Sequence, residues 1–384
     1  MRYVIFFLVF GVVLGSAHWY VYARLVRDAA LPGPWGRIAT VLIALLFVAL
    51  MAGFVAARAL PRSVTGPWFW VSYTWLGVLF FMVFSLGAAD LARIITLRVK
   101  DVTPDDPERR LAISRFFAGA AALVGLGASG VGVATALSSV AINKVKVSLK
   151  SLGKDAEGMR IVQISDVHVG PTIGKTFIED IVSRINALKP DVVAITGDLV
   201  DGSVEDLKEH VAPLGKIQAK HGVYFVTGNH EYYSGAREWI RHLGTLGIKT
   251  LENERVRIGG EHGFDLAGID DPTGDPDLEK ALEGRDASRG VVLLAHQPRA
   301  ITLADKLGVD LQLSGHTHGG QMFPWNLFVR LQQPFVAGLH QLAHAQIYVS
   351  CGTGYWGPPM RVGTTAEITE IELSSKKDPA AASA

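Results

Sequence analysis

The chain has 384 residues, of which 49% are hydrophobic and 19% are charged, and its formal net charge is +1. The lysines and arginines are scattered rather than gathered into a basic stripe, which argues against nucleic acid as a partner. The one cysteine, Cys351, can form neither an intrachain disulfide nor a thiolate zinc site, and we expect it to be a small packing residue.

The composition of the chain changes near residue 145. Residues 1–145 contain four long apolar runs, whereas residues 155–375 mix short apolar runs, charges and glycine turns as a globular domain does. About 20 apolar helical residues cross a bilayer core. We therefore predict a transmembrane region with four helices, at residues 3–23, 38–57, 68–89 and 116–140. The first run could instead be a cleaved signal peptide, but it is long and lacks a clear small-residue cleavage site.

Basic residues in the loops predict the orientation of these spans. The first and third loops are rich in arginine and lysine, whereas the amino terminus and the second loop hold only Arg2, Arg58 and Arg62. This bias predicts an extracytoplasmic C-terminal domain, although four lysines just after the last span oppose it. The pair Arg109-Arg110 is similar to a twin-arginine export signal, but the residues that follow depart from that pattern. We favour a plain topology determinant for this pair.

From Met159 onward, short β-rich runs alternate with helical patterns. Strands are predicted at 159–165, 192–196, 223–227, 264–269, 291–295, 311–314, 346–350 and 366–373, and helices at 175–188, 204–214 and 236–246. We predict an α/β fold for residues 155–375, a two-sheet αββα sandwich with its helices outside. The alanine-rich residues 376–384 are predicted to be a disordered tail.

Five short motifs follow the ends of predicted strands. Ligands gather beyond the carboxyl ends of strands in α/β sheets, so these motifs are expected to converge. Each motif alone is more typical of a turn or a helix cap, but together they supply enough oxygen and imidazole groups for two metal ions. The motifs are Asp166-Val-His168, Gly197-Asp198, Gly228-Asn229-His230-Glu231, His296 and Gly315-His316-Thr317-His318.

The residue types in these motifs suit metal-assisted hydrolysis. The Asp198 carboxylate could bridge two cations, and Asn229 offers a neutral oxygen ligand. His230 is expected beside the metals, where it could bind a phosphoryl oxygen or protonate a leaving group, and Asp201 could orient a histidine. Two divalent ions about 3.5–4 Å apart activate a water and clamp a phosphoryl group. A phosphoester hydrolase is therefore the leading hypothesis.

The ordered set D-x-H, G-D-x-x-D, G-N-H-E, H and G-H-T-H resembles the calcineurin-like metallophosphoesterase family over about residues 158–374. The resemblance implies that Asp198 bridges two metals and that His230, oriented by Asp201, acts on the phosphoryl group or the leaving oxygen. Manganese, iron or zinc suits such mixed oxygen and imidazole ligation. The implied ligands are Asp166, His168, Asp198 and His318 for one metal, and Asp198, Asn229, His296 and His316 for the other.

The four-span region and the extension Gly319-Gly320-Gln321 resemble bacterial membrane-linked members of this family, some of which cleave the pyrophosphate of UDP-diacylglucosamine. This resemblance implies a bacterial cell membrane and a phosphodiester or pyrophosphate of a lipid-linked substrate. Alternatives are a cyclic-nucleotide or phosphoprotein phosphatase of the same fold, or a non-catalytic metal-bearing membrane scaffold. The presence of His230 argues against the scaffold, and the lack of charges within the spans argues against a transporter.

Two segments suggest contacts with the substrate. The apolar side chains within Gln321-Met-Phe-Pro-Trp-Asn-Leu-Phe328 could contact acyl chains or the membrane interface. They could equally belong to a covered loop that packs on the sandwich. Arg361, in the glycine-rich loop that begins at Gly352, is predicted to contact a substrate phosphate.

Overall fold

The computed structural model describes residues 2–59, 62–99 and 106–375, which divide into two compact units. The first unit contains the residues up to Leu137 together with Gly357–Met360. The second contains Ser138–Trp356 and the residues from Arg361 onward. The predicted disordered tail, residues 376–384, lies outside the described residues.

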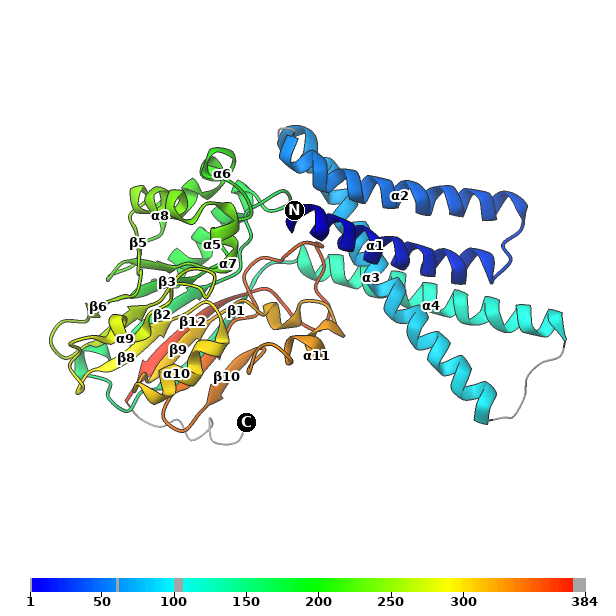
Figure 1. Ribbon diagram of the computed structural model, residues 1–384. Helices are drawn as coiled ribbons and strands as arrows, with labels where there is room; N and C mark the ends of the chain where they lie inside the picture. Colours follow the sequence, from blue (N-terminus) through cyan, green and yellow to red (C-terminus); the bar gives the residue numbers. More distant parts are fainter. Residues whose placement is uncertain (1, 60–61, 100–105, 376–384) are drawn as a thin grey trace. The chain divides into compact units, whose positions relative to one another are not determined.

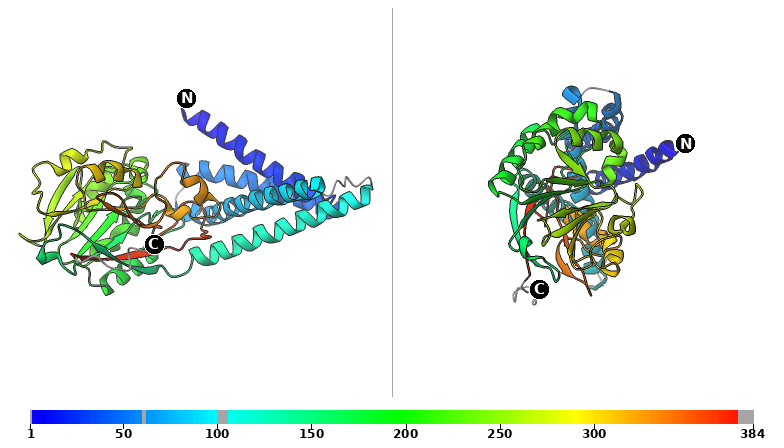
Figure 2. Two further views of the ribbon diagram at one scale, coloured as in Figure 1. Left: turned by 90° about the horizontal axis from the view of Figure 1, so that it is seen from below. Right: turned by 90° about the vertical axis from the view of Figure 1, so that its left-hand side faces the viewer.

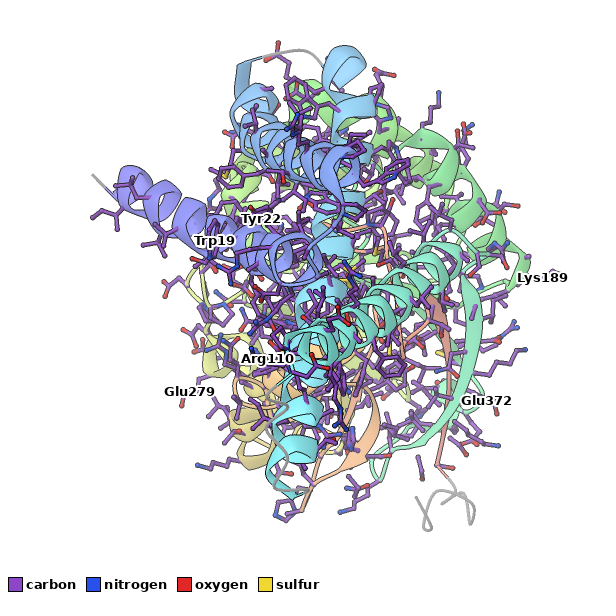
Figure 3. The ribbon with its side chains drawn as sticks, turned by 90° about the vertical axis from the view of Figure 1, so that its right-hand side faces the viewer. Trp19, Tyr22, Arg110, Lys189, Glu279 and Glu372 are labelled. Carbon is purple, nitrogen blue, oxygen red and sulfur yellow. The ribbon has the colours of Figure 1, made fainter. Side chains whose placement is uncertain are left out.

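Long helices form the first unit (Figures 1 and 2). They are α1 (Arg2–Tyr22), which continues as a π-helical turn (Ala23–Arg27), α2 (Gly33–Ala59), α3 (Arg62–Val99) and α4 (Pro107–Ala136). Each contains a stretch that is long and apolar enough to cross a membrane. On α1, the rings of Trp19 and Tyr22 lie 5.3 Å apart (Figure 3). The four predicted spans thus correspond to four helices.

Helix α4 has a well-defined start. The Asp106 carboxylate accepts a hydrogen bond from the backbone N–H of Glu108 at 3.0 Å, and Pro107 occupies the first helical position. The Arg109-Arg110 pair lies directly after this cap, in the first turns of α4, with Arg110 labelled in Figure 3.

The predicted boundary near residue 145 and the end of the fourth span at residue 140 are wrong. Helix α4 ends at Ala136, and β1 (Ala141–Ser148) pairs in parallel with β12 (Glu367–Ser374) in the second unit. Lys144 and Lys146 form ion pairs with Glu370 and Glu372 at 3.0 and 3.5 Å across this pair, and Figure 3 labels Glu372 on β12. Residues 141–148 were not predicted as a strand, because the partner that makes them one lies more than 200 residues away in the sequence.

The second unit contains two six-stranded sheets (Figure 1). The first has the order β1-β12-β2-β3-β4-β5, with β2 to β5 parallel and β12 antiparallel to β2. The second has the order β10-β11-β9-β8-β7-β6, with antiparallel strands at both edges. The further strands are β2 (Arg160–Ile164), β3 (Val192–Thr196), β4 (Val223–Val226), β5 (Ile248–Thr250), β6 (Glu254–Ile258), β7 (Phe264–Gly268), β8 (Gly290–Leu294), β9 (Leu311–Ser314), β10 (Gly338–Gln341) and β11 (Gln346–Val349).

Helices cover the outer faces of both sheets (Figure 1). Helices α5 (Lys175–Ala187), α6 (Val204–Val211) and α8 (Ala236–Thr245) pack on the first sheet, and α9 (Leu278–Leu282) and α10 (Ile301–Lys306) pack on the second. A third core between the sheets contains Ile161, Phe264 and Leu313. These layers confirm the predicted αββα sandwich. Short helices α7 (Asn229–Ser234) and α11 (Trp325–Val329) follow β4 and β9.

Candidate metal centre

Loops from both sheets bring the five motifs together. Asp166, Asp198 and Asn229 follow the carboxyl ends of β2, β3 and β4, and His296 and His316 follow those of β8 and β9. The backbone N–H of His316 donates to both oxygens of Asp166, at 2.8 and 3.0 Å, and so joins the two sheets. The predicted convergence at strand ends is therefore present in the structure.

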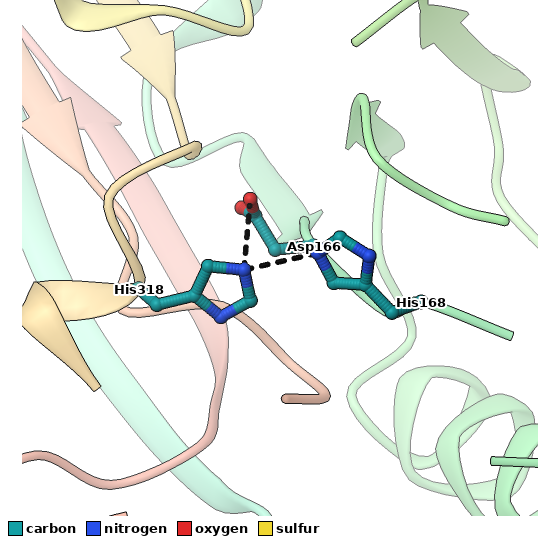
Figure 4. Close-up of side chains that lie close together, drawn as sticks. All are labelled: Asp166, His168 and His318. Carbon is teal, nitrogen blue, oxygen red and sulfur yellow. Dashed lines mark hydrogen bonds and ion pairs between the residues drawn. The ribbon is translucent and has the colours of Figure 1, made fainter. Parts of the chain in front are cut away.

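Asp166, His168 and His318 form one candidate metal-binding group (Figure 4). His318 Nε2 lies 3.5 Å from Asp166 Oδ1 and 3.0 Å from His168 Nε2. All three side chains are buried. Two imidazole nitrogens that face each other at this distance, beside a carboxylate, form a donor set that suits a divalent cation.

Asp198, His296 and His316 form a second group. His296 Nε2 lies 3.1 Å from Asp198 Oδ2 and 3.2 Å from His316 Nδ1. Asn229, which follows β4, has a buried Oδ1 atom with no hydrogen-bond partner among the described residues. An unpaired buried carbonyl costs about 1–3 kcal/mol, so this oxygen fits a metal ligand better than a packing group.

The two oxygens of Asp198 have different surroundings. Oδ1 accepts the backbone N–H of His230 at 2.9 Å. Oδ2 lies 3.1 Å from His296 Nε2 and 4.0 Å from His168 Nε2, and so faces both histidine groups. This arrangement fits the bridging position expected for Asp198.

Asp201 contacts two histidines through one oxygen. Its Oδ1 atom lies 3.0 Å from His168 Nδ1 and 2.5 Å from His230 Nδ1. Burial opposes ionisation of Asp201, but the two imidazoles hold the pKa of its carboxyl well below the usual range. Asp201 thus orients a candidate ligand and the candidate proton donor together. The Nε2 atom of each ring faces the site, where that of His168 lies 3.0 Å from His318 Nε2.

Burial and neighbouring charges shift the pKa values of the histidines at the site in opposite directions. Burial disfavours protonation of His230, but Asp201 and Asp198 raise the pKa of His230 to about 9. Burial and the positive charge of His296 lower the pKa of His316 to about 3, which keeps His316 neutral. Against the effect of burial, Asp198 also raises the pKa of His296 to about 10, so a cation that binds the second group must displace a proton from His296.

Residues 159–320 match the family described as calcineurin-like phosphoesterase. The chain is 40% identical to a transmembrane protein with a metallophosphoesterase domain of Bos taurus, over 79% of this chain and 73% of that protein. It is 35% identical to the protein of the same name from Danio rerio, over 94% of this chain and 86% of that protein. A metallophosphoesterase of Campylobacter jejuni is 31% identical over 98% of this chain and 100% of its own length.

The chain belongs to the calcineurin-like phosphoesterase family. It is a phosphoester hydrolase of the metallophosphoesterase class, as the ordered motifs predicted. The family match covers strands β2 to β9 and all five motifs, and the similarity to the relatives extends into the helical unit.

Glu231 has a role in this metallophosphoesterase that sequence reasoning missed. Its buried carboxylate accepts backbone N–H groups of Gly228 at 2.6 Å, Asp198 at 2.9 Å, Leu199 at 2.8 Å and Val200 at 3.3 Å. It therefore joins the loop of Asp198 to the loop of Asn229. The available signal was the position of Glu231, three residues after Gly228, where a glutamate reaches back to the residue that precedes a helix.

The ligand loops of the metallophosphoesterase hold an unusual backbone conformation. Five of the seven predicted metal ligands have positive φ angles between 50° and 71°, a region that non-glycine residues rarely adopt. These residues are Asp166, His168, Asp198, His316 and His318. Such conformations cost about 1–3 kcal/mol each and cluster at functional sites. The glycines beside them leave no room for a side chain, since a Cβ atom on Gly228 or Gly315 would collide with Asp198 or Asp166.

The predicted contact between Arg361 and a substrate phosphate is wrong. Arg361 is fully buried, and its guanidinium donates to the backbone carbonyls of Cys351 at 2.8 Å and of Gly354 at 2.6 Å. A further donor reaches Thr364 Oγ1 at 3.2 Å. Its donors are directed at the loop itself, so Arg361 organises the glycine-rich loop around it. Solvent exposure cannot be read from a glycine-rich sequence, which is why the prediction failed.

Two exposed aromatic side chains flank His230. The rings of Tyr233 and Trp356 lie 5.4 and 6.1 Å from its imidazole, with exposed fractions of 71% and 54%. The Gln321 side chain donates to the carbonyl of Trp356 and accepts its N–H, both at 2.9 Å. The Trp356 loop is thereby attached to the segment that follows His318. In that segment Phe323, Trp325 and Leu327 are exposed, so the alternative of a covered loop is wrong.

Proposed function

We propose that this phosphoesterase uses two divalent cations, manganese, iron or zinc, to hydrolyse a phosphodiester or pyrophosphate bond of a membrane-associated, lipid-linked substrate. One cation would be held by Asp166, His168, Asp198 and His318, and the other by Asp198, Asn229, His296 and His316. The unpartnered Oδ1 of Asn229, beside an Asp198 oxygen that faces both histidine groups, is the observation that carries this proposal. When bound, such a pair supplies an activated water and neutralises charge on the phosphoryl group.

His230 supplies the proton in this proposal. Its Nδ1 atom is held by Asp201, so the proton on Nε2 points into the site, where Nε2 lies 4.0 Å from Asp198 Oδ2. Donation from Nε2 to the leaving oxygen would create a better leaving group, and Asp201 would keep the ring in the same orientation afterwards. Tyr233 and Trp356 limit how the ring can tilt, because their rings meet it nearly edge-on.

Two observations support a lipid-linked substrate in a membrane, and the similarity to the Campylobacter jejuni protein over its full length supports a bacterial one. The same chain carries four helices suited to a bilayer, so the hydrolase is tethered where such substrates reside. The surface beside His230 is apolar and exposed, as suits a substrate with acyl chains. The loop bias of lysine and arginine supports an extracytoplasmic catalytic unit.

The test uses the full chain, purified in detergent and loaded with Mn²⁺. Hydrolysis of an aryl phosphodiester should fall at least 100-fold in Asp198→Ala and in His230→Ala, and should persist in His262→Ala, whose exposed histidine lies outside the five motifs. Full activity in either site variant would contradict the proposed roles.

A panel of a lipid pyrophosphate, a phosphodiester lipid, a cyclic nucleotide and a phosphopeptide then identifies the substrate class. Preference for either of the last two would overturn the lipid assignment.

A further inference from the structure

The metal edge of the sandwich carries a set of large apolar side chains at its surface. They are Phe323, Trp325, Leu327, Leu331 and Trp356, which we call the apolar rim. Leu331 is 82% exposed, and the other four are about half-exposed. Soluble surfaces tolerate single exposed apolar residues, but several large ones in one short segment mark an interaction site.

The apolar rim is attached to the metal-binding loops. The backbone of Asn326, in α11, packs against Gly320, two residues after His318. Phe323 donates its backbone N–H to Val362 at 2.9 Å, and Gln321 pairs with the main chain of Trp356. Trp356 in turn lies against His230. A molecule that contacts the rim is therefore held next to the candidate proton donor.

The composition of the rim suits a bilayer interface, and the same chain carries four helices suited to a bilayer. Two of its five residues are tryptophans, whose rings are enriched where membrane meets water because one side is apolar and the indole N–H remains hydrated. The adjacent Arg330 supplies a cationic side chain of the kind that accompanies apolar residues on interfacial helices.

The first strand of the second unit, β1, begins at the same edge of the sandwich as the metal ligands. Ala141, the first residue of β1, pairs with Glu367, and Thr369 of β12 pairs with Gln163 of β2. Ala141 therefore lies at the end of the sheet where β2 finishes and Asp166 begins. Only residues 137–140 separate it from Ala136, the last residue of α4. The chain itself thus leads from a bilayer-suited helix to the edge that bears the metal ligands.

We propose that the apolar rim inserts into the headgroup region of the lipid bilayer, so that the metal edge faces the membrane surface. Interfacial side chains of this type enter about 5–10 Å into the boundary between headgroups and acyl chains. The bilayer is then a binding partner of the catalytic unit itself as well as of the spans. This proposal goes beyond the hydrolase function, because insertion requires neither metal nor substrate turnover.

The test measures lipid contact on the full chain in vesicles of phosphatidylglycerol and phosphatidylethanolamine. Cys351→Ala removes the one native thiol, and Leu331→Cys then receives an environment-sensitive fluorophore. The matched control is Ala287→Cys, which is exposed at the amino end of β8, opposite the edge that bears His296. Spin-labelled lipids should quench the probe at position 331 at least threefold more than the probe at position 287.

Several outcomes would overturn the proposal. Equal quenching at the two positions would mean that the rim does not contact lipid. Protection of the Leu331 probe from both spin-labelled lipid and aqueous iodide would mean that protein covers the rim. A second variant, Trp325→Asp with Leu331→Asp, should lower hydrolysis of vesicle-borne substrate at least tenfold while hydrolysis of a soluble aryl phosphodiester stays within twofold. Quenching is measured without turnover, so failure of the proposed hydrolase function would leave this test intact.

Discussion

The Asp201 carboxylate and the His230 imidazole meet at 2.5 Å, between Oδ1 and Nδ1. The same oxygen lies 3.0 Å from His168 Nδ1, so one carboxylate connects a candidate metal ligand with the candidate proton donor. Asp201 was predicted to orient one histidine, and in the structure it contacts two. Changes at Asp201 should therefore affect metal binding and proton transfer together.

Asp201→Asn should lower kcat/KM for an aryl phosphodiester by about 10–100-fold, since loss of a carboxylate behind a metal-ligating histidine has effects of this size. The neutral amide no longer stabilises a protonated His230, so the fall should be largest in kcat. Steady-state kinetics with metal analysis measure both effects. Asp286→Asn, at an exposed turn, serves as the control and should retain full activity and metal content.

Glu231→Gln should destabilise the catalytic unit by about 1–3 kcal/mol, because an amide cannot accept from all the backbone N–H groups that the carboxylate now binds. Thermal unfolding of the full chain in detergent measures this loss. Metal content should also fall, since the loops of Asp198 and Asn229 lose their common anchor. Unchanged unfolding and metal content would show that the four hydrogen bonds do not hold these loops.

The variant Asn229→Ala tests whether Asn229 is a metal ligand or a packing residue. Without metal, removal of an unpaired buried carbonyl should leave stability unchanged or raise it, by up to about 1–3 kcal/mol. With Mn²⁺, the variant should gain less stability than the unaltered chain, because stabilisation by a ligand follows its affinity. Melting curves with EDTA and with Mn²⁺ give both values. Equal metal-dependent shifts in the two proteins would rule out Asn229 as a ligand.

Arg361→Met should lower stability by about 3–5 kcal/mol, because it leaves several buried carbonyls around Arg361 without donors. The fraction that remains folded should keep a KM for aryl phosphodiester within about threefold, since the side chain does not reach the surface. A raised KM with unchanged melting temperature would restore a substrate-binding role for Arg361.

Chelation should abolish hydrolysis without unfolding the catalytic unit, whose three hydrophobic cores lie within and around the sandwich. Hydrolysis should return on addition of Mn²⁺, Fe²⁺ or Zn²⁺, and the ion that restores most activity identifies the preferred metal. Circular dichroism before and after EDTA checks the fold, and an assay with each ion checks recovery. Full hydrolysis in excess EDTA would exclude a metal-dependent reaction.

Sequence patterns alone were sufficient to predict the main features of the architecture of this protein. Four apolar runs, the alternation of strands and helices, and the placement of five motifs at strand ends are local properties, set by hydrophobic periodicity and by glycine turns. They were sufficient to predict the sandwich, and the resemblance of the ordered motifs to a known family was sufficient to predict the family. The seven candidate ligands were implied by the same resemblance and stay a prediction. Short edge strands such as β5 and β10 were missed, because three or four residues hold too little periodicity.

Tertiary structure alone decided the features that depend on distant parts of the chain. The sharing of Asp201 by His168 and His230, the unpartnered oxygen of Asn229 and the burial of Arg361 each require contacts that no local pattern encodes. Strand β1 was not predicted, and its first residues were assigned to the transmembrane region, because its partner, β12, lies far along the chain. Burial and hydrogen bonding depend on what the fold places beside a residue, whereas periodicity depends only on its neighbours in sequence.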